Sequence, residues 1–431
     1  MAKVKFANPF FSELAIDDSY PLDEYYPRCY DAASGERDKE AIRYALQEPI
    51  GCPRICTSVK NTDKVLILID DKSRSTPVKE ILPLLIAELS AAGVPDDCVK
   101  IMVALGTHRY MTQEELKERV GKDIYARFTI LNHLWEQPEH LQHLGVTEQK
   151  TQIWLNKLAV QADYIIGVGH IVPHRVAGYS GGAKIVQPGI SGPLTTGQTH
   201  WLSALYSAEQ MLGKADNPVR REIEAVAEKI AFKFIVNVVQ DSRGKVAGVF
   251  AGHPVAAHRA GCSFAQNIYG VQVEQKADIV IAESYPAESE LWIATKALQA
   301  AAIVVKSGGV IILAAECQEG ISCSHGRIIE EYGFRPFAEV KQLLEQGLLE
   351  DLNVASYLAR VGNILEETKT ILVNKGITAK QGEKIGFAVC DDLPSALKQA
   401  LTYTGEAPRI AVLHQGSELL PILSKKVEVG K

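Results

Sequence analysis

The chain has 431 residues, 46% of them hydrophobic and 23% charged, and this length suffices for two or three domains with buried cores. The formal net charge of −6 argues against a dedicated nucleic-acid surface, and we expect neither a membrane span nor a signal peptide. Eight scattered cysteines indicate a reducing compartment, so we predict a cytoplasmic protein without membrane or nucleic-acid partners.

The first half of the chain alternates short apolar strands with amphipathic helices. The apolar run 64–70 ends in carboxylates, which is typical of a buried parallel strand. Residues 112–121 form a predicted helix in which Thr112 is the cap and Glu115 completes a capping box. The other elements predicted here are a helix from Pro77 to Gly93, strands at 99–105, 126–131, 163–169 and 232–240, and a hairpin after the last strand.

A second alternation of strands and helices begins near residue 277. Its predicted strands are 277–283, 309–315, 369–374, 384–389 and 409–414, and its predicted helices are 290–305 and 393–402. Such alternation favours α/β domains with mostly parallel, doubly wound sheets. We predict an N-terminal domain over 1–270 and a C-terminal domain over 271–431, whose last strand could return to the first domain.

Polar residues cluster directly after four of the predicted strands. In open α/β sheets ligands bind beyond the carboxyl ends of strands, often between domains. We therefore expect a single site in the cleft between the two domains. The four clusters span residues 70–74, 106–109, 170–184 and 283–296.

The segment 168–192, "VGHIVPHRVAGYSGGAKIVQPGISG", is the most unusual stretch of the chain. It is not a phosphate-binding Walker loop, because Ala183 separates Gly182 from Lys184 and Ile185 replaces the hydroxyl residue. A dinucleotide-binding GxGxxG motif is also absent. Glycine-rich backbone can still cradle a phosphate through its amides, and a tight structural loop is the alternative reading.

Two other chemistries could use these residues. A zinc site could combine histidines, but an HxxxH pair at 170–174 needs a helix that Pro173 disfavours, and His170 alone reads as a structural histidine. Lys184 could form a pyridoxal-phosphate Schiff base. That reading leaves three histidines without a role, namely His108, His174 and His200.

Taken together, the motifs resemble the nickel-pincer lactate racemase family. The resemblance lies in "DDKSRSTP" (70–77), "GTHRYMTQEEL" (106–116), "IVPHRVAGYSGGAKIVQPGISG" (171–192) and "GQTH" (197–200), with a weaker match at 285–296. It implies a nickel-pincer nucleotide, a pyridinium-3-thioamide-5-thiocarboxylic acid mononucleotide with Ni(II), made by separate cofactor-synthesis enzymes.

The resemblance also implies how this cofactor is held. Lys184 would carry it covalently, and His200 would supply the nitrogen ligand of nickel, an arrangement of soft sulfur and imidazole that suits Ni(II). Asp71 matches a family aspartate in the cofactor-binding set. The glycine loop would leave room for the mononucleotide through Gly178, Ser180, Gly181 and Gly182.

The implied reaction is racemisation or epimerisation of a 2-hydroxy acid at C2 by reversible hydride transfer. Its C2–H bond is poorly acidic, because the neighbouring carboxylate disfavours a second negative charge. His108 and His174 match the family's two acid–base residues. Arg74 matches the arginine that polarises the developing carbonyl, and Lys296 matches the lysine that anchors the substrate carboxylate.

The chain departs from the family near the substrate lysine. Lactate racemases read roughly YPLDQNIYQAVK, whereas this chain reads "YPAESELWIATK", so that Trp292 replaces tyrosine and Ile293 replaces glutamine. On a helix, Trp292 shares a face with Lys296 and Ile293 lies about 100° round. Isoleucine cannot hydrogen-bond a substrate oxygen, which predicts a 2-hydroxy acid other than lactate. A non-catalytic carrier of the nickel cofactor is a further alternative.

Overall fold

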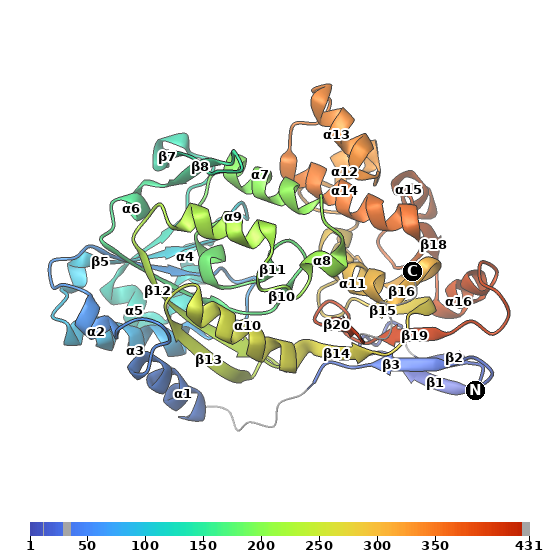
Figure 1. The fold of residues 1–431 in the computed structure, drawn as a ribbon, viewed down its shortest axis with the longest axis horizontal. Helices are drawn as coiled ribbons and strands as arrows, with labels where there is room; N and C mark the ends of the chain where they lie inside the picture. Colours follow the sequence, from blue (N-terminus) through green and yellow to red (C-terminus); the bar gives the residue numbers. More distant parts are fainter. Residues whose placement is uncertain (12, 29–35, 425–431) are drawn as a thin grey trace. The chain divides into compact units, whose positions relative to one another are not determined.

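The computed structural model describes residues 1–11, 13–28 and 36–424, and Cys29 lies outside this part. The chain forms two compact units (Figure 1). The motif unit comprises residues 29–200 and 213–268, and the C-terminal unit comprises residues 1–28, 201–212 and 269–431. Within the described ranges, no helix combines the length and apolarity needed to cross a membrane.

The motif unit is built on a six-stranded sheet in the order β13-β12-β9-β4-β5-β6. All neighbouring pairs are parallel except β12 with β13, which form the predicted antiparallel hairpin. The strands are β4 (Val65–Ile69), β5 (Val99–Val103), β6 (Thr129–Asn132), β9 (Tyr164–His170), β12 (Phe232–Gln240) and β13 (Val246–Gly252). Every residue of β4 is buried, because helices cover both faces of the sheet.

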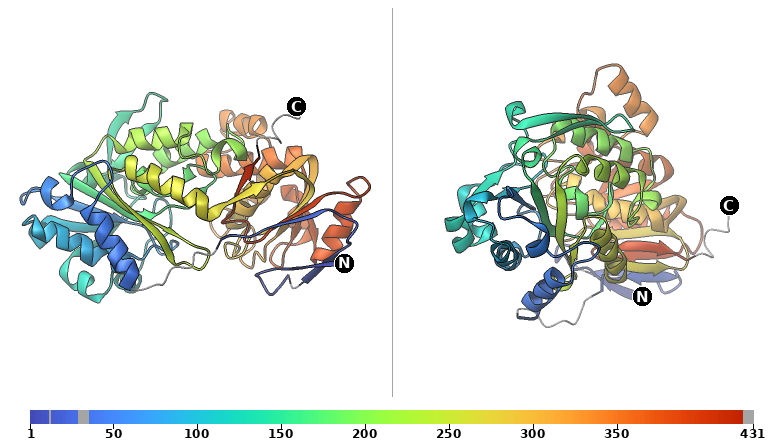
Figure 2. Two further views of the ribbon diagram at one scale, coloured as in Figure 1. Left: turned by 60° about the horizontal axis from the view of Figure 1, so that its bottom comes forward. Right: turned by 60° about the vertical axis from the view of Figure 1, so that its left-hand side comes forward.

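Helices lie on both faces of this sheet (Figure 2). One face carries α1 (Glu36–Gln47), α3 (Val78–Ala91), α4 (Gln113–Val120) and α5 (Lys122–Arg127), and the other carries α9 (Pro218–Ala227) and α10 (Ala256–Tyr269). The smaller elements are α2 (Ile55–Ser58), η1 (Asp96–Cys98), η2 (Pro138–His140), β7 (Leu141–Val146), β8 (Gln152–Asn156), α6 (Lys157–Val160), β10 (Pro173–His174), β11 (Gly178–Tyr179), η3 (Gly182–Ile185) and α7 (Pro193–Ser203).

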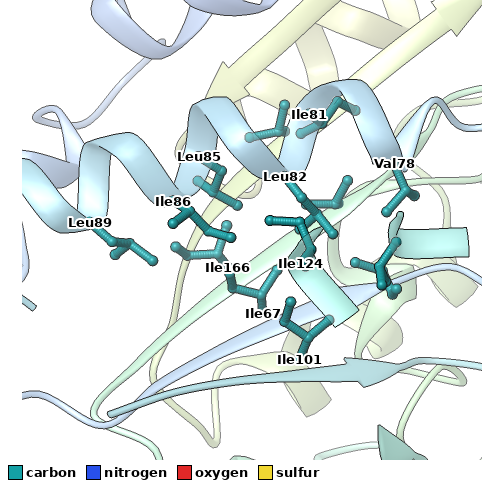
Figure 3. Packing of buried hydrophobic residues seen from close by; sticks show 14 of the residues in the cluster. Ile67, Val78, Ile81, Leu82, Leu85, Ile86, Leu89, Ile101, Ile124 and Ile166 are labelled. Carbon is teal, nitrogen blue, oxygen red and sulfur yellow. The ribbon is translucent and has the colours of Figure 1, made fainter. Parts of the chain in front are cut away.

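The packing of α3 shows how the core of the motif unit forms (Figure 3). Its apolar residues recur at helical spacing and point toward Ile67, Ile101 and Ile166 on three adjacent strands. Leu82 and Leu85 are fully buried there, and each such side chain stabilises the fold by roughly 1.5–3 kcal/mol through burial. The helix thus covers one face of these strands, whose spacing is set by the hydrogen bonds of the sheet.

The C-terminal unit contains a second, wholly parallel sheet in the order β18-β17-β16-β15-β19-β3. Its strands are β3 (Leu22–Tyr25), β15 (Ala277–Glu283), β16 (Val305–Ala314), β17 (Lys369–Val373), β18 (Ala388–Cys390) and β19 (Ile410–Leu413). Its helices are α8 (Ala208–Met211), α11 (Leu291–Val304), α12 (Gly326–Tyr332), α13 (Phe337–Glu345), α14 (Leu352–Glu367), α15 (Ala379–Ile385) and α16 (Leu393–Leu401). The prediction of two α/β domains with mostly parallel sheets is confirmed.

The two ends of the chain differ from the predicted domains. Residues 1–28 belong to the C-terminal unit, because β3 pairs with β19 and the hairpin of β1 (Ala2–Lys5) with β2 (Glu13–Ile16) packs on that core. Within the described residues, the last strand pairs inside the C-terminal unit. It is β20 (Leu420–Leu423), which pairs in parallel with β14 (Gly270–Val273) of the same unit.

Two predicted strands are only partly correct. Residues 126–131 divide between the end of α5 and β6, and residues 384–389 divide between the end of α15 and β18. Both runs are short and apolar, and periodicity alone cannot separate a strand from the last turn of a helix in such runs. The predicted capping box is confirmed, because the Thr112 side chain accepts from the Glu115 N–H and the Glu115 side chain accepts from the Thr112 N–H.

Candidate active site

The carboxyl edge of the first sheet gathers the predicted catalytic segments. Strands β9, β4 and β5 are direct neighbours and run in the same direction, so their carboxyl ends lie side by side. Asp70 and Asp71 follow β4, His108 follows β5, and His170 ends β9. Side chains far apart in the sequence therefore meet at one edge of one sheet.

Asp71 holds the ring of His108. Its Oδ2 lies 2.7 Å from His108 Nδ1, while Oδ1 accepts from the Ser73 hydroxyl at 2.5 Å and the Ser73 N–H at 3.0 Å. Burial of the Asp71 carboxyl opposes ionisation, but the hydrogen bonds from His108 and Ser73, together with the charge of Arg74, hold its pKa at about 2. An ionised Asp71 accepts a hydrogen bond from the Nδ1–H group, which leaves Nε2 as the proton acceptor of a neutral His108.

This contact gives Asp71 a different partner from the one expected. The resemblance assigned Asp71 to the cofactor-binding set, whereas both of its carboxylate oxygens are engaged by His108 and Ser73. The Asp71 side chain is 10% exposed and the His108 side chain is 58% exposed. A buried carboxylate thus orients a histidine whose ring reaches the surface of the motif unit.

A buried network fixes the loop that carries Asp71 and Arg74. Arg119 on α4 donates to the carbonyl oxygens of Asp70 (3.1 Å), Arg74 (3.0 Å) and Thr76 (3.1 Å), and it also forms an ion pair with the Asp70 carboxylate. The Thr76 hydroxyl donates to Asp70 at 2.5 Å and lies 3.2 Å from His170 Nδ1. His170 is therefore a structural histidine.

Sequence reasoning missed Arg119. It stands in the last turn of a predicted helix, where a basic residue is ordinary because it complements the helix dipole. Only the packing of α4 against the loop after β4 reveals its contacts. Arg74 itself is half-exposed, and its positive charge helps to lower the pKa of the Asp71 carboxyl.

His174 is held as the opposite tautomer to His108. It lies on β10 in a two-stranded hairpin with β11, and its Nδ1 accepts from the N–H groups of Val176 (3.1 Å) and Ala177 (3.3 Å). A neutral His174 therefore carries its proton on Nε2. Because His170 and His174 lie on strands, they do not form the helical HxxxH pair of a zinc site.

The glycines of the loop allow other parts of the protein to pack closely against its backbone. Gly178 has a φ of 75°, and a Cβ there would lie 1.9 Å from the Lys214 carbonyl oxygen. Gly182 has a φ of 59°, and a Cβ there would meet the His258 ring at 2.8 Å. A side chain at either position would collide with protein atoms, so the packing of the loop itself requires glycine at both.

Gly181 and Ser180 are also used internally. A Cβ at Gly181 would lie 2.7 Å from the Asn237 side-chain oxygen. The Ser180 hydroxyl donates to the His170 carbonyl at 2.7 Å and accepts from the Val172 N–H at 3.0 Å. Ser180 therefore ties the loop to the end of β9, and the glycine at 181 allows the backbone to pack closely against Asn237 on β12.

Lys184 and His200 lie on short helical segments after this loop. Lys184 is half-buried in η3, and its N–H donates to the Gly181 carbonyl at 3.2 Å. His200 lies on α7, where its Nδ1 is 2.8 Å from the Thr196 carbonyl oxygen. Nδ1 therefore donates its proton to this carbonyl, which places the lone pair of a neutral ring on Nε2. Histidines that bind metals typically donate their other N–H to a carbonyl or carboxylate in this way.

Three further predicted residues belong to the C-terminal unit. Trp292, Ile293 and Lys296 are partly exposed on α11. The Trp292 ring packs against Tyr357 at 4.2 Å and His325 at 4.9 Å between centroids. Tyr357 also donates to the Leu291 carbonyl at 3.1 Å, so α14 fixes the start of the helix that carries Lys296.

The parallel sheets and the carboxylate-held histidine define a two-unit α/β enzyme. Comparison with family models matches residues 12–213 to the lactate racemase N-terminal domain and residues 272–420 to the lactate racemase C-terminal domain. The chain belongs to the lactate racemase family, and it is accordingly a racemase-like enzyme of the isomerase class.

Individual relatives agree with this assignment. The lactate racemase of Thermoanaerobacterium thermosaccharolyticum is 32% identical over 396 residues, which are 89% of this chain and 90% of that protein. The lactate racemase of Lactiplantibacillus plantarum is 28% identical over 389 residues, 88% of this chain and 90% of that protein.

Two solved structures share the fold. The lactate racemase apoprotein from Thermoanaerobacterium thermosaccharolyticum superimposes with a TM-score of 0.83 at 28% identity, covering 97% of this chain and 99% of that one. A Thermotoga maritima protein superimposes with a TM-score of 0.70 at 23% identity, covering 90% of this chain and 98% of that one. The second likeness concerns the fold alone.

Proposed function

We propose that this enzyme racemises or epimerises a 2-hydroxy acid at C2 with a nickel-pincer nucleotide attached to Lys184. Membership of the lactate racemase family supports the reaction class. The observation that carries the proposal is the Asp71–His108 pair at the carboxyl edge of the first sheet. It presents a base at His108 Nε2 beside the positive charge of Arg74.

The donor set fits the cofactor. His200 donates its Nδ1 proton to a carbonyl, as metal-binding histidines typically do, so Nε2 would be the nickel ligand, and Lys184 would supply the amine for covalent attachment. When bound, the cofactor supplies a reversible acceptor for the hydride at C2. The cofactor itself is the product of separate synthesis enzymes, which makes those enzymes partners of this chain.

The protein's own residues handle the proton and the charge. His108 Nε2 accepts the hydroxyl proton of the substrate as the C2–H bond breaks, and Asp71 stabilises the resulting imidazolium. The Arg74 guanidinium stabilises negative charge on the same oxygen. Lys296 binds the substrate carboxylate. Return of the hydrogen to the opposite face of the 2-keto acid gives the other enantiomer or epimer.

His174 starts this cycle as the other neutral tautomer, with its proton on Nε2. With Nδ1 accepting two N–H groups, its Nε2 donates a hydrogen bond to the substrate oxygen. To accept a proton at Nε2, the ring must first carry a proton on Nδ1, so the N–H groups of Val176 and Ala177 must move away. We infer that segment 175–177 adjusts when the second enantiomer reacts.

The residues beside Lys296 argue for a substrate other than lactate. The family's glutamine hydrogen-bonds a substrate oxygen, whereas Ile293 is apolar. A longer or less polar substituent at C2 suits Ile293 and the Trp292 ring. Sugar acids and dicarboxylates would need polar partners from other parts of the chain.

Isotope retention tests the reaction. Protein co-produced with the cofactor-synthesis enzymes is offered enantiopure lactate, 2-hydroxybutyrate, phenyllactate, malate and gluconate, each with deuterium at C2. Chiral chromatography with mass spectrometry should detect inversion of one acid other than lactate, with the label retained at C2. Rapid loss of deuterium to water would contradict hydride transfer, and a preference for lactate would contradict the role of Ile293.

Single histidine variants provide the matched controls for this assay. His108→Ala and His174→Ala should each lower kcat/KM by roughly two to four powers of ten. The values of kcat/KM for the forward and the reverse reaction should fall by the same factor. Their ratio equals the equilibrium constant between the two stereoisomers, which no variant can change. Wild-type rates in either variant would remove that histidine from the mechanism.

Intact-mass spectrometry and metal analysis test the cofactor. Lys184→Ala should abolish the covalent mass increase, whereas Lys233→Ala, which removes an exposed lysine of the same unit, should keep it. His200→Ala should retain the adduct but lose nickel on dialysis. An adduct on the Lys184→Ala protein would refute the assignment.

A further inference from the structure

The loop before Lys184 has an unusual set of partners. Its five consecutive carbonyl oxygens, from residue 177 to residue 181, all accept hydrogen bonds from the segment 213–220 or from α10. Arg220 donates to Ala177 (Nε, 3.3 Å), Tyr179 (Nη2) and Gly181 (Nη1, 3.1 Å), the Gly213 N–H donates to Gly178 (3.0 Å), and His258 Nε2 lies 2.9 Å from the Ser180 oxygen.

Arg220 is the centre of this set. Its side chain is fully buried, and no carboxylate among the described residues forms an ion pair with it. Burial lowers the pKa of Arg220 to about 10, so the guanidinium is still charged near neutrality. Three carbonyl dipoles stabilise this charge in place of an acidic partner.

His258 completes the set as a neutral group. Its Nδ1 lies 3.1 Å from an Arg259 nitrogen, which donates to it, so Nε2 carries the proton that goes to the Ser180 carbonyl. Burial and the nearby charge of Arg220 lower the pKa of His258 well below its usual value. The ring also fills the space beside Gly182 where a side chain would otherwise lie.

The Gly181 carbonyl oxygen links these contacts to Lys184. The Gly181 carbonyl accepts both from Arg220 Nη1 at 3.1 Å and from the Lys184 N–H at 3.2 Å. The loop has left-handed glycines at positions 178, 181 and 182, and glycine backbone is conformationally permissive. The guanidinium supplies three of the five hydrogen bonds that segment 213–220 and α10 donate to the carbonyls of 177–181, so its removal takes away most of the contacts that hold this conformation.

We propose that Arg220 is the positioning residue of the cofactor-attachment loop: it fixes the carbonyls of 177–181 and thereby presents Lys184 for reaction with the cofactor. This inference rests on the proposed attachment of the cofactor to Lys184. The loop is thus ordered before the cofactor arrives, so attachment does not have to offset the entropy of ordering it.

The test compares Arg220→Met and Arg220→Lys with Arg221→Met. Arg221 is the next residue on α9, is 66% exposed and pairs with Asp216, so its removal leaves the loop contacts intact. Hydrogen exchange of the cofactor-free proteins is measured over 176–186 and over α14 as a reference. The fraction of folded protein carrying the Lys184 adduct is then measured after co-production with the synthesis enzymes.

We expect Arg220→Met to speed exchange in 176–186 at least tenfold without changing α14, and to lower the adduct fraction at least fivefold. Arg220→Lys should recover part of both losses, and Arg221→Met should match wild type. Unchanged loop exchange and adduct fraction in Arg220→Met would overturn the inference. A wild-type protein without an adduct on Lys184 would instead overturn the proposed function, which separates the two failures.

A second pair of variants applies if Arg220→Met does not fold. His258→Gln keeps a donor toward the Ser180 carbonyl, whereas His258→Leu removes it. Faster exchange in 176–186 and a lower adduct fraction in His258→Leu alone would support the role of the donor set. Equal values in the two variants would contradict it.

Discussion

At the scale of single residues, the three candidate histidines differ in what each hydrogen-bonds through Nδ1. His108 gives Nδ1 to Asp71, His200 gives Nδ1 to a carbonyl, and His174 receives N–H groups at Nδ1. When neutral, His108 and His200 therefore carry the lone pair on Nε2, whereas His174 carries its proton there. The neighbours of each ring, and not the residue type, decide which nitrogen carries the proton of the neutral ring.

Replacing Asp71 tests the orientation of His108. Asp71→Asn should lower kcat on the order of 10²-fold, because the amide can turn its NH₂ toward Nδ1 and leave the Nε2 proton in place. KM should change little, since Asp71 does not contact the substrate in the proposed mechanism. A kcat within twofold of wild type would show that Asp71 does not decide which ring nitrogen of His108 carries the proton.

The depressed pKa of Asp71 also predicts a pH-dependent stability. A carboxyl with a pKa of about 2 in the folded state and about 3.8 in the unfolded state contributes about 2 kcal/mol at neutral pH. This contribution is present above pH 4 and is lost as the pH falls through 2. Urea denaturation should therefore show Asp71→Asn less stable than wild type at pH 7, with the difference shrinking by pH 3. Asp97→Asn, at an exposed aspartate, is the control.

At the scale of elements, α4 acts as a brace for two site loops. Its capping-box residue Glu115 also binds Arg109, which follows His108 in the chain, and Lys72, which follows Asp71. Its last turn supplies Arg119, which binds three carbonyls of the loop after β4. The sequence predicts the helix and its cap, but not the two loops that it holds together.

Arg119→Met should therefore affect both stability and activity. Breaking a buried, hydrogen-bonded ion pair costs about 3–5 kcal/mol, and the loop that carries Arg74 and Asp71 would lose three main-chain partners. Arg109→Met removes an exposed guanidinium near the same helix and should leave the unfolding midpoint nearly unchanged. Equal midpoints for the two variants in urea denaturation would contradict the bracing role of Arg119.

At the scale of the whole molecule, the first residues complete a sheet built mainly from the last third of the chain. Strand β3 pairs with β19, and Asn8 links acidic residues at the carboxyl ends of that sheet. The Asn8 N–H donates to Glu283 at 2.7 Å, and its amide donates to Glu288 at 2.5 Å and Glu316 at 2.8 Å. One buried asparagine thus satisfies three carboxylates of the C-terminal unit.

Removing this link should destabilise the C-terminal unit. Asn8→Ala leaves buried carboxylate oxygens without donors, and we expect a loss of about 2–3 kcal/mol in the free energy of unfolding. Lys3→Ala, which breaks an exposed ion pair with Glu13 in the same segment, should be neutral. The measurement is hydrogen exchange in β15 and β16, which should be faster in Asn8→Ala than in Lys3→Ala. Equal protection in the two variants would argue against the role of Asn8.

The sequence by itself determined the α/β class, most strands and the motifs, because these depend on local periodicity and on residue types at short spacing. It did not determine the course of the N-terminal segment, since the pairing of β3 with β19 joins residues almost 400 positions apart. Such pairing leaves no trace in local periodicity.

Tertiary structure alone decided what surrounds each motif. The glycines at 178, 181 and 182 suggested space for a ligand, yet their missing side chains accommodate Lys214, Asn237 and His258. Arg119 and Arg220 were indistinguishable from ordinary helix residues until their helices packed against loops. A sequence specifies which groups can donate and accept, but only the packed fold brings each donor to the acceptor that gives it a role.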